Sequence, residues 1–191
     1  GTIGSYDGEA VFESDVTDAN GDYLFENLLP GNYIVCEVLQ ATWEQSAPTS
    51  APTGETLVTN CPGPTNGYAF AMAGADRADN DFGNFQRGAI AIVKNSTKGG
   101  PVSEPGAVFS YDSSSVTDNG DGDEDPAIGS VCVSGLLPGT YTVNEVTPPP
   151  GYGDATEVDV PVTAAAGTNC TDNLPTGAGV VTFTNPPLYD L

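Results

Sequence analysis

The sequence predicts an all-β chain that contains two tandem β-sandwich domains. The first observation is an internal repeat, because ENLLPGNYIVCEV at residues 26–38 matches SGLLPGTYTVNEV at residues 134–146. The second is that apolar residues alternate over short runs separated by Gly, Pro, Asn and Asp, which is typical of strands joined by tight turns. No helical periodicity extends beyond two turns. Many short, evenly spaced strands with such turns favour a sandwich in each half.

Further matched segments occur in the same order in the two halves. An ordered set of matches indicates that one domain is present twice. We therefore predict domain 1 at residues 1–87 and domain 2 at residues 88–191. The other matched segments are residues 1–7 with 106–112, 16–18 with 116–118, 60–61 with 169–170 and 82–84 with 183–185.

The turns between the predicted strands are marked by residues that tolerate a left-handed backbone. DANG at residues 18–21 and DNG at residues 118–120 carry the Asp, Asn and Gly that hairpin turns favour. Leu-Pro-Gly then leads each copy into its most clearly repeated strand. These signals place turns at equivalent points of both domains.

The predicted strands are identified by alternation of side chains between two faces. Residues 33–38 alternate in this way, as does GAIAIVK at residues 88–94. In the second of these strands Ile90, Ile92 and Lys94 share one face. We therefore expect the stem of Lys94 to point into the core of domain 2.

The composition excludes several classes of function. The chain has 4 Lys and Arg against 26 Asp and Glu, a formal charge of −22, so it would repel nucleic acid and anionic lipid. It has no histidine, which removes His-dependent triads and His metal sites. No apolar run reaches the roughly 18–20 residues of a membrane helix. We expect a non-enzymatic protein without nucleic-acid binding or membrane insertion.

The four cysteines indicate an oxidising, extracellular location. Two fall in each repeat, so we expect the disulfides Cys36–Cys61 and Cys132–Cys170. Cys36 aligns with Asn144 rather than with a cysteine, so this pairing rests on domain membership alone, and four cysteines allow three pairings. Metal binding is the weaker interpretation because the chain has no CxxC and no histidine.

An acidic stretch in domain 2 is a weak candidate for calcium. Asp121, Asp123 and Asp125 place carboxylates at alternate positions. The EF-hand pattern fails because neither register puts Gly at position 6 and Glu at position 12. We interpret the stretch as a solvated loop and predict no cofactor, with calcium as the alternative.

Two triplets match the N-glycosylation sequon. They begin at Asn95 (NST) and Asn169 (NCT). Such triplets also occur by chance, and they matter only if the host glycosylates its surface proteins. We keep both asparagines as candidate modification sites.

The quoted segments resemble those of two domain families of bacterial surface proteins. The first half resembles the SdrD B-like domains of adhesins, and the second resembles Cna-B or SpaA-type prealbumin-like domains. This resemblance implies immunoglobulin-like or transthyretin-like sandwiches strung in tandem as stalks and pilus shafts. Its segments in domain 1 are residues 17–25 (TDANGDYLF), 29–37 (LPGNYIVCE), 43–46 (WEQS) and 81–84 (DFGN). Those in domain 2 are residues 88–94 (GAIAIVK), 106–109 (GAVF), 137–145 (LPGTYTVNE), 150–152 (PGY) and 183–185 (FTN).

The resemblance also implies an intramolecular isopeptide bond in domain 2. Many members of the family join a first-strand Lys to a last-strand Asn with the help of a Glu, and Lys94, Asn185 and Glu145 occupy those positions. Burial favours the neutral amine and the protonated carboxyl. The amine can then attack the Asn amide carbon while the Glu polarises the amide carbonyl and transfers protons. The alternative is a Lys94–Glu145 ion pair with Asn185 capping a turn.

Domain 1 departs from this pattern because it has no lysine. Glu37 and Asn84 match the Glu and Asn positions, but the only lysines are Lys94 and Lys98. Since residue 1 aligns with residue 106, domain 1 lacks the counterpart of the lysine-bearing first strand. We expect either that this sequence is a piece of a longer repeat protein or that a neighbouring subunit donates the strand.

Together these features predict a structural repeat unit of an extracellular cell-surface stalk or filament. Disulfides and a self-formed isopeptide bond would stabilise it, and its partners would be neighbouring copies or flanking domains. The alternative is an adhesin module that binds a host protein or glycan.

Overall fold

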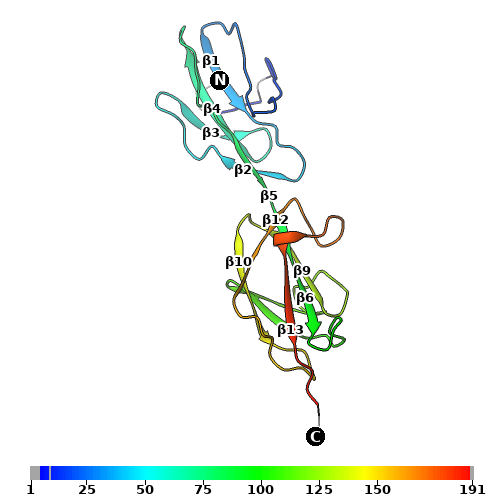
Figure 1. Cartoon of the computed structure of the whole chain (residues 1–191). Coiled ribbons are helices and arrows are strands. Elements are labelled where there is room, and N and C mark those ends of the chain that lie inside the picture. The colour runs from blue at the N-terminus through cyan, green and yellow to red at the C-terminus, as the bar shows by residue number, and fades with distance from the viewer. Residues whose placement is uncertain (1–4, 9, 190–191) are drawn as a thin grey trace. The chain divides into compact units, whose positions relative to one another are not determined.

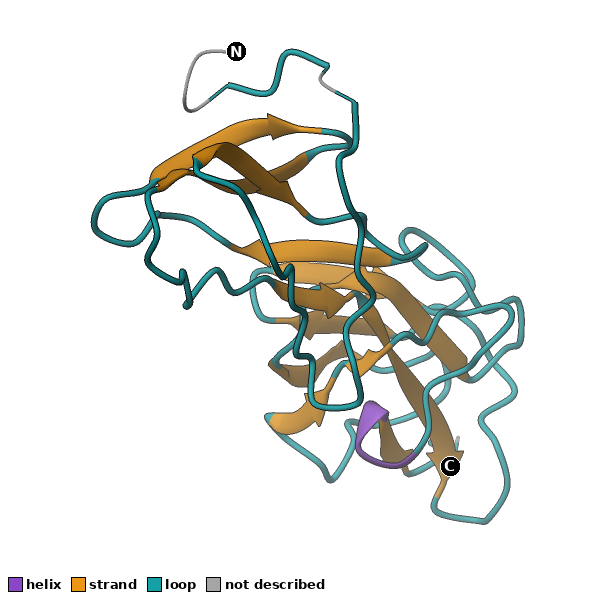
Figure 2. Ribbon diagram, turned by 90° about the horizontal axis from the view of Figure 1, so that it is seen from above, coloured by secondary structure: helices purple, strands orange, loops and turns teal. Residues whose placement is uncertain are grey.

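The computed structural model describes residues 5–8 and 10–189. The chain divides into two compact units, unit 1 (Gly1–Asn84) and unit 2 (Phe85–Leu191), which are described separately. All regular elements in the described residues are β-strands except one short 3₁₀ helix, η1 at Gly177–Gly179, drawn in purple in Figure 2. The predicted all-β class is therefore confirmed. No helix in the described part of the chain has the length and apolar character needed to cross a membrane.

Unit 1 contains a three-stranded antiparallel sheet in the order β1-β4-β3 and a two-stranded sheet of β2 and β5 (Figure 1). Alternation of side chains in β1 and β4 gives the main sheet one face that packs on a small core. That core contains Val58, Cys61 and Ala69, with Ile34 and Tyr6 packed against it. The strands are β1 (Gly31–Cys36), β2 (Trp43–Ala47), β3 (Thr56–Cys61), β4 (Thr65–Met72) and β5 (Gly83–Gln86), of which β5 begins in unit 1 and ends two residues beyond its last residue, Asn84.

Unit 2 is a β-sandwich of two four-stranded sheets. One sheet has the order β11-β10-β7-β8, and the other has β6 between β12, β13 and β9. Strand β13 runs parallel to β6, so the first and last strands of the unit are neighbours (Figure 1). The strands are β6 (Gly88–Ser96), β7 (Val108–Tyr111), β8 (Ser114–Thr117), β9 (Ser130–Leu136), β10 (Thr140–Thr147), β11 (Val160–Thr163), β12 (Ala165–Ala166) and β13 (Val180–Asn185).

The core of unit 2 lies between these sheets and is much larger than that of unit 1. β6 is paired on both edges, and every residue from Gly88 to Ser96 is buried or half-buried, which fits its nearly continuous apolar sequence. Phe109 on β7 and Phe183 on β13 meet across the core with ring centroids 5.3 Å apart. The buried residues of this core are Ile90, Ile92, Ala107, Phe109, Val116, Val131, Val133, Val143, Val162, Ala164, Val181 and Phe183.

Equivalent residues of the two repeats have different surroundings. Val116 on β8 is 1 % exposed, whereas its sequence counterpart Val16 lies outside any strand and is 87 % exposed. Val11 and Phe12, in the same part of unit 1, are also about four-fifths exposed. Unit 1 thus leaves apolar residues uncovered where unit 2 buries them.

We predict that this difference appears in stability. Val116→Ala leaves a cavity in a closed core and is expected to lower the free energy of unfolding of unit 2 by about 1–3 kcal/mol. Val16→Ala is expected to change the free energy of unfolding of unit 1 by less than about 0.5 kcal/mol. Differential scanning calorimetry of the two variants tests this, with Trp43 fluorescence following unit 1. Equal losses for the two variants would contradict the assignment of Val16 to an uncovered surface.

Candidate functional site

The structure brings Lys94, Glu145 and Asn185 together inside the sandwich of unit 2. They come from β6, β10 and β13, so both sheets contribute. The parallel register opposes Phe183 to Lys94 and Asn185 to Ser96, which puts the lysine and asparagine side chains on the same inner face. Lys94 and Asn185 are fully buried, and the side chain of Glu145 is 3 % exposed.

The three side chains form a closed hydrogen-bonded triad. The Lys94 Nζ donates to Glu145 Oε1 and to Asn185 Oδ1. The Asn185 Nδ2 donates to Glu145 Oε2 at 2.7 Å and to the carbonyl oxygen of Gly153 at 2.9 Å. The backbone N–H of Ala155 donates to Glu145 Oε2 at 3.0 Å. Each carboxylate oxygen of Glu145 therefore accepts from a different nitrogen, Oε1 from the Lys94 amine and Oε2 from the Asn185 amide.

The surroundings of the triad are apolar and favour the uncharged amine. The Lys94 Nζ lies 5.3 Å from the ring centroid of Phe109 and 5.9 Å from that of Phe183. Burial lowers the pKa of Lys94 below its usual range, and the hydrogen bond and negative charge of Glu145 oppose that shift only in part. The Lys94 amine contacts the Asn185 amide, and the uncharged form of an amine is the nucleophilic one.

Sequence reasoning missed Gly153 and Ala155 as members of this site. Both act through backbone groups, the Gly153 carbonyl and the Ala155 N–H. The Glu145 carboxylate accepts a hydrogen bond from the amide nitrogen of Asn185, while the Lys94 Nζ donates to the amide oxygen. The expected role of Glu145 in polarising the carbonyl and transferring protons stays a prediction.

Unit 1 contains the corresponding acid and amide without a lysine. The Asn84 Nδ2 donates to Glu37 Oε1, and the Gln45 Nε2 donates to Glu37 Oε2 at 3.1 Å. Gln45 is held in turn by the N–H of Asn66, which donates to Gln45 Oε1 at 2.7 Å. Asn84 is exposed and Glu37 is half-buried. The pair is thus more open to solvent than the triad of unit 2.

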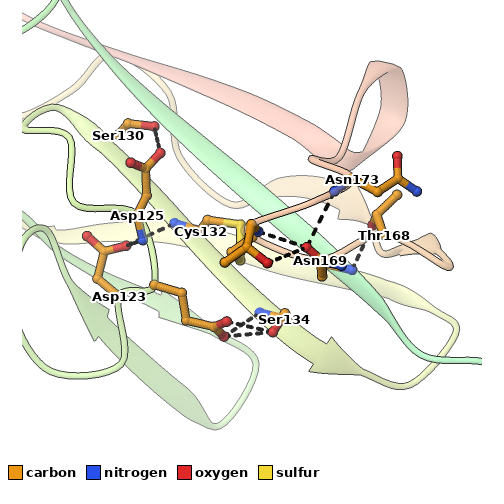
Figure 3. The surroundings of a disulfide bond; sticks show 12 residues. Asp123, Asp125, Ser130, Cys132, Ser134, Thr168, Asn169 and Asn173 are labelled. Carbon is orange, nitrogen blue, oxygen red and sulfur yellow. Dashed lines mark hydrogen bonds between the residues drawn. A yellow bond between two sulfur atoms is a disulfide. The ribbon is translucent and has the colours of Figure 1, made fainter. Parts of the chain in front are cut away.

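Each unit contains one disulfide, between the cysteines that the repeat pairs by domain. Cys36 is joined to Cys61 in unit 1, and Cys132 is joined to Cys170 in unit 2 (Figure 3). The bonds close chain segments of 25 and 38 residues. Gly67 on β4 makes room for the first disulfide, because a Cβ there would lie 2.6 Å from the Cys61 Sγ and 2.2 Å from the carbonyl oxygen of Val35.

The carboxylates of the acidic loop are used to hold the loop together. Asp123 Oδ1 accepts the backbone N–H of Asp125 at 2.9 Å and that of Cys132 at 3.0 Å, which ties the loop to the strand that carries the disulfide (Figure 3). Asp125 Oδ2 accepts the Ser130 hydroxyl at 2.7 Å. Among the described residues, which include Asp121, Asp123 and Asp125, no three Asp, Glu, Cys or His side chains are grouped so that they could hold a metal ion.

The two sequon asparagines differ in their local structure. Asn169 Oδ1 accepts the backbone N–H of Thr171 at 2.8 Å and its hydroxyl at 3.1 Å, so the side chain organises a turn next to the disulfide. Asn95 lies on β6 beside Lys94, is half-buried, and forms an isolated bridge with Pro101. Glycosylation at either position stays a prediction.

Asp118 is a buried carboxylate that sequence reasoning did not single out. It is 1 % exposed, and both of its carboxylate oxygens accept the backbone N–H of Gly129, at 3.1 and 3.3 Å. Gly129 has a φ of +79°, and a Cβ there would lie 2.7 Å from the carbonyl oxygen of Val102. Burial raises the pKa of Asp118, and the Gly129 hydrogen bond offsets that shift only partly.

No family model matches the chain, and none of the curated proteins matches it either. Among solved structures, the chain is similar to GBS52, the minor pilin of Streptococcus agalactiae, with 16% identity over 65% of this chain and 61% of that chain and a TM-score of 0.39. It is also similar to BcpA, the major pilin subunit of Bacillus cereus, with 28% identity over 53% of this chain and 28% of that chain and a TM-score of 0.37.

A third similar structure is the group B streptococcus pilus 2b backbone protein. Its identity is 16%, with 86% of this chain and 88% of that chain covered and a TM-score of 0.38. All three TM-scores are below 0.5.

We predict that each disulfide stabilises its own unit. Replacing Cys132 and Cys170 together by Ala should lower the free energy of unfolding of unit 2 by about 3–4 kcal/mol, because the unfolded chain regains loop entropy. The matched pair of substitutions at Cys36 and Cys61 should lower that of unit 1 by a similar amount. Calorimetry, with Trp43 fluorescence for unit 1, separates the two effects. A lower free energy of unfolding in the unit that keeps its disulfide would contradict the prediction that each disulfide stabilises only its own unit.

We also predict a specific pH dependence from Asp118. Because the pKa of Asp118 is raised in the folded state, the folded protein binds this proton more tightly than the unfolded chain does. The contribution of Asp118 to the free energy of unfolding is therefore fully present below its unfolded pKa of 3.8 and is lost as the pH rises through its folded pKa. Asp118→Asn keeps an acceptor for Gly129 and removes this loss. The variant should therefore gain stability relative to the unaltered protein between pH 3 and pH 7, measured by thermal unfolding across that range. A constant difference would contradict the prediction.

Proposed function

We propose that this chain is a structural unit of an extracellular, pilus-like surface filament or stalk, in which unit 2 is locked by an isopeptide bond between Lys94 and Asn185. The observation that carries the proposal is the buried triad, which sets an amine, an amide and a bridging carboxyl in contact between the first and last strands of the unit.

The bond would form by exchange of one amide for another. The neutral Lys94 Nζ attacks the Asn185 side-chain carbonyl carbon, and the new C–N bond replaces the bond to Nδ2. Glu145 accepts a proton from the amine at Oε1 and delivers a proton from Oε2 to the departing Nδ2. The departing nitrogen leaves as ammonia. Atoms and charge balance without a cofactor, and no water is consumed.

The position of the bond suits a load-bearing module. The crosslinked residues are 91 positions apart and lie near one end of the parallel β6–β13 pair. A force applied to the two ends of unit 2 would be carried by the bond, so the chain between the crosslinked residues could not extend. The Cys132–Cys170 disulfide lies within that protected segment.

The other features fit an extracellular assembly. Each unit has its own disulfide, which persists in an oxidising compartment. The net charge of −22 favours solubility and opposes nonspecific contact with acidic surfaces. The natural partners of such a unit are neighbouring copies or flanking domains, arranged as a linear array.

The intact mass of the denatured, reduced protein tests the proposal. It should lie about 17 Da below the sequence mass because ammonia is lost. Glu145→Gln and Asn185→Ala should each restore the full mass expected for the variant. Glu37→Gln is the matched control, because Glu37 contacts an asparagine amide in unit 1 without a lysine, and it should keep the deficit.

Peptide mapping should then identify a single branched peptide that joins Lys94 to Asn185. An unaltered protein at its full sequence mass would overturn the proposed bond. A deficit that survives both Glu145→Gln and Asn185→Ala would assign the lost ammonia to another site and would also overturn it.

A further inference from the structure

We propose that Asp118 is a positioning residue for the crosslinking reaction, because it holds the backbone of Lys94 in place through Gly129. This inference rests on the function proposed above and deepens it, since it names a buried carboxylate outside the triad on which the rate of bond formation depends. The contacts that carry it run from one sheet of unit 2 to the other.

The backbone of Asp118 is fixed at the end of β8. Its N–H donates to the carbonyl oxygen of Ala107 at 2.9 Å, and its own carbonyl oxygen accepts the N–H of Gly106 at 3.0 Å. These bonds extend the contact between the β7 and β8 segments beyond Thr117, the last residue of β8. Because the residue is only 1 % exposed, the sheet that holds its backbone also fixes the direction of its carboxylate.

Gly129 receives this carboxylate and transmits the constraint to the second sheet. Its N–H donates to both carboxylate oxygens of Asp118, at 3.1 and 3.3 Å. Gly129 directly precedes β9, which pairs with β6. It is packed so closely that an added Cβ would lie 2.7 Å from the carbonyl oxygen of Val102. Asp118 and Val102 thus hold Gly129 from two sides.

Lys94 is the residue of β6 that this assembly holds. Its N–H donates to the carbonyl oxygen of Gly129 at 2.8 Å, and its carbonyl oxygen accepts the N–H of Val102 at 3.0 Å. From this anchored backbone the buried side chain reaches Glu145 and Asn185. Since a close-packed core leaves the stem little room to readjust, a shift of the Lys94 backbone would displace the amine as well.

Removal of the carboxylate would produce such a shift. Gly129 is buried, so its N–H has no access to water and must find another acceptor when Asp118 is truncated. Movement of Gly129 carries the carbonyl group that binds the Lys94 N–H. A displacement of about 1 Å in a reacting group can slow a reaction about 100-fold, so a small movement is sufficient.

The contribution assigned to Asp118 is one of position, because its charge would act in the opposite direction. Burial lowers the pKa of Lys94, whereas the negative charges of Glu145, Glu157 and Asp118 raise it. An ionised Asp118 therefore favours the ammonium form, which is not nucleophilic. Asparagine at this position keeps an acceptor for Gly129 and lacks the charge, so it separates the two contributions.

The experiment measures how fast the full chain loses ammonia after synthesis. The unaltered protein and each variant are made in a cell-free system that permits disulfide formation. Samples taken over time are denatured and reduced, and the fraction of chains about 17 Da below the sequence mass is determined. Asp118→Ala should slow this loss about 10-fold or more. Asp118→Asn should lose ammonia at least as fast as the unaltered protein.

Val116→Ala is the matched control for a purely structural effect. It truncates a buried side chain on the same strand, two residues before Asp118, and keeps the Asp118 carboxylate. It should lose ammonia at the unaltered rate. All samples contain trimethylamine N-oxide, which favours the folded state, and rates are expressed per chain whose unit 2 resists proteolysis. If Asp118→Ala does not fold, Asp118→Ser takes its place, because the shorter side chain fills part of the cavity but ends short of Gly129.

The outcomes separate this inference from the function proposed above. Equal rates in the unaltered protein and Asp118→Ala would overturn the positioning role while the locked unit 2 stands. Asp118→Asn slowed as much as Asp118→Ala would assign the effect to charge, and Val116→Ala slowed as much would assign it to lost stability; either result also overturns the positioning role. If the unaltered protein never shows the loss of about 17 Da, the crosslink itself is overturned.

Discussion

Burial of the Lys94 amine is the constraint on which the rest of unit 2 depends. Removing an ammonium group from water costs several kcal/mol unless charged and hydrogen-bonding partners replace the water. Glu145 and Asn185 are those partners. Glu145 lies on β10 in one sheet, and Asn185 lies on β13 in the other. A slip of β13 by one residue would turn Asn185 to the opposite face. The contact among Lys94, Glu145 and Asn185 therefore fixes the register of β13 against β6, beside a core cluster of aliphatic and aromatic residues.

Local alternation and the repeat predict the all-β class, whereas the three side chains of the triad follow from the resemblance to domains of bacterial surface proteins. The sequence does not predict Gly153 and Ala155, which contribute a backbone C=O and a backbone N–H that nearly every residue type could supply. Asp118 was missed for a related reason. Its burial depends on the close approach of Gly129 to Val102, which is a tertiary contact that neither segment indicates alone.

The two units show how far a shared motif determines structure. The matching LPG segments both lead into strands, β1 and β10, since turn and strand are local properties. Val16 and Val116 also match, yet only Val116 is buried. Burial requires an opposing sheet, and in unit 2 that sheet is built on β6. Matching segments thus form strands in both units, but they do not build cores of the same size. The units differ in whether a second sheet covers these strands.

The parallel pairing of β6 with β13 also has a consequence for the timing of biosynthesis. These strands are the first and last of unit 2, and the contact between Lys94 and Asn185 spans 91 residues. At the usual rate of about 5–20 residues per second, a ribosome needs roughly 5–20 s to make that segment. Until then the Lys94 amine stays hydrated and protonated. The amine becomes buried beside Glu145 and Asn185 only after the last strand has been synthesised and docked, so the order of synthesis sets the time at which the triad can assemble.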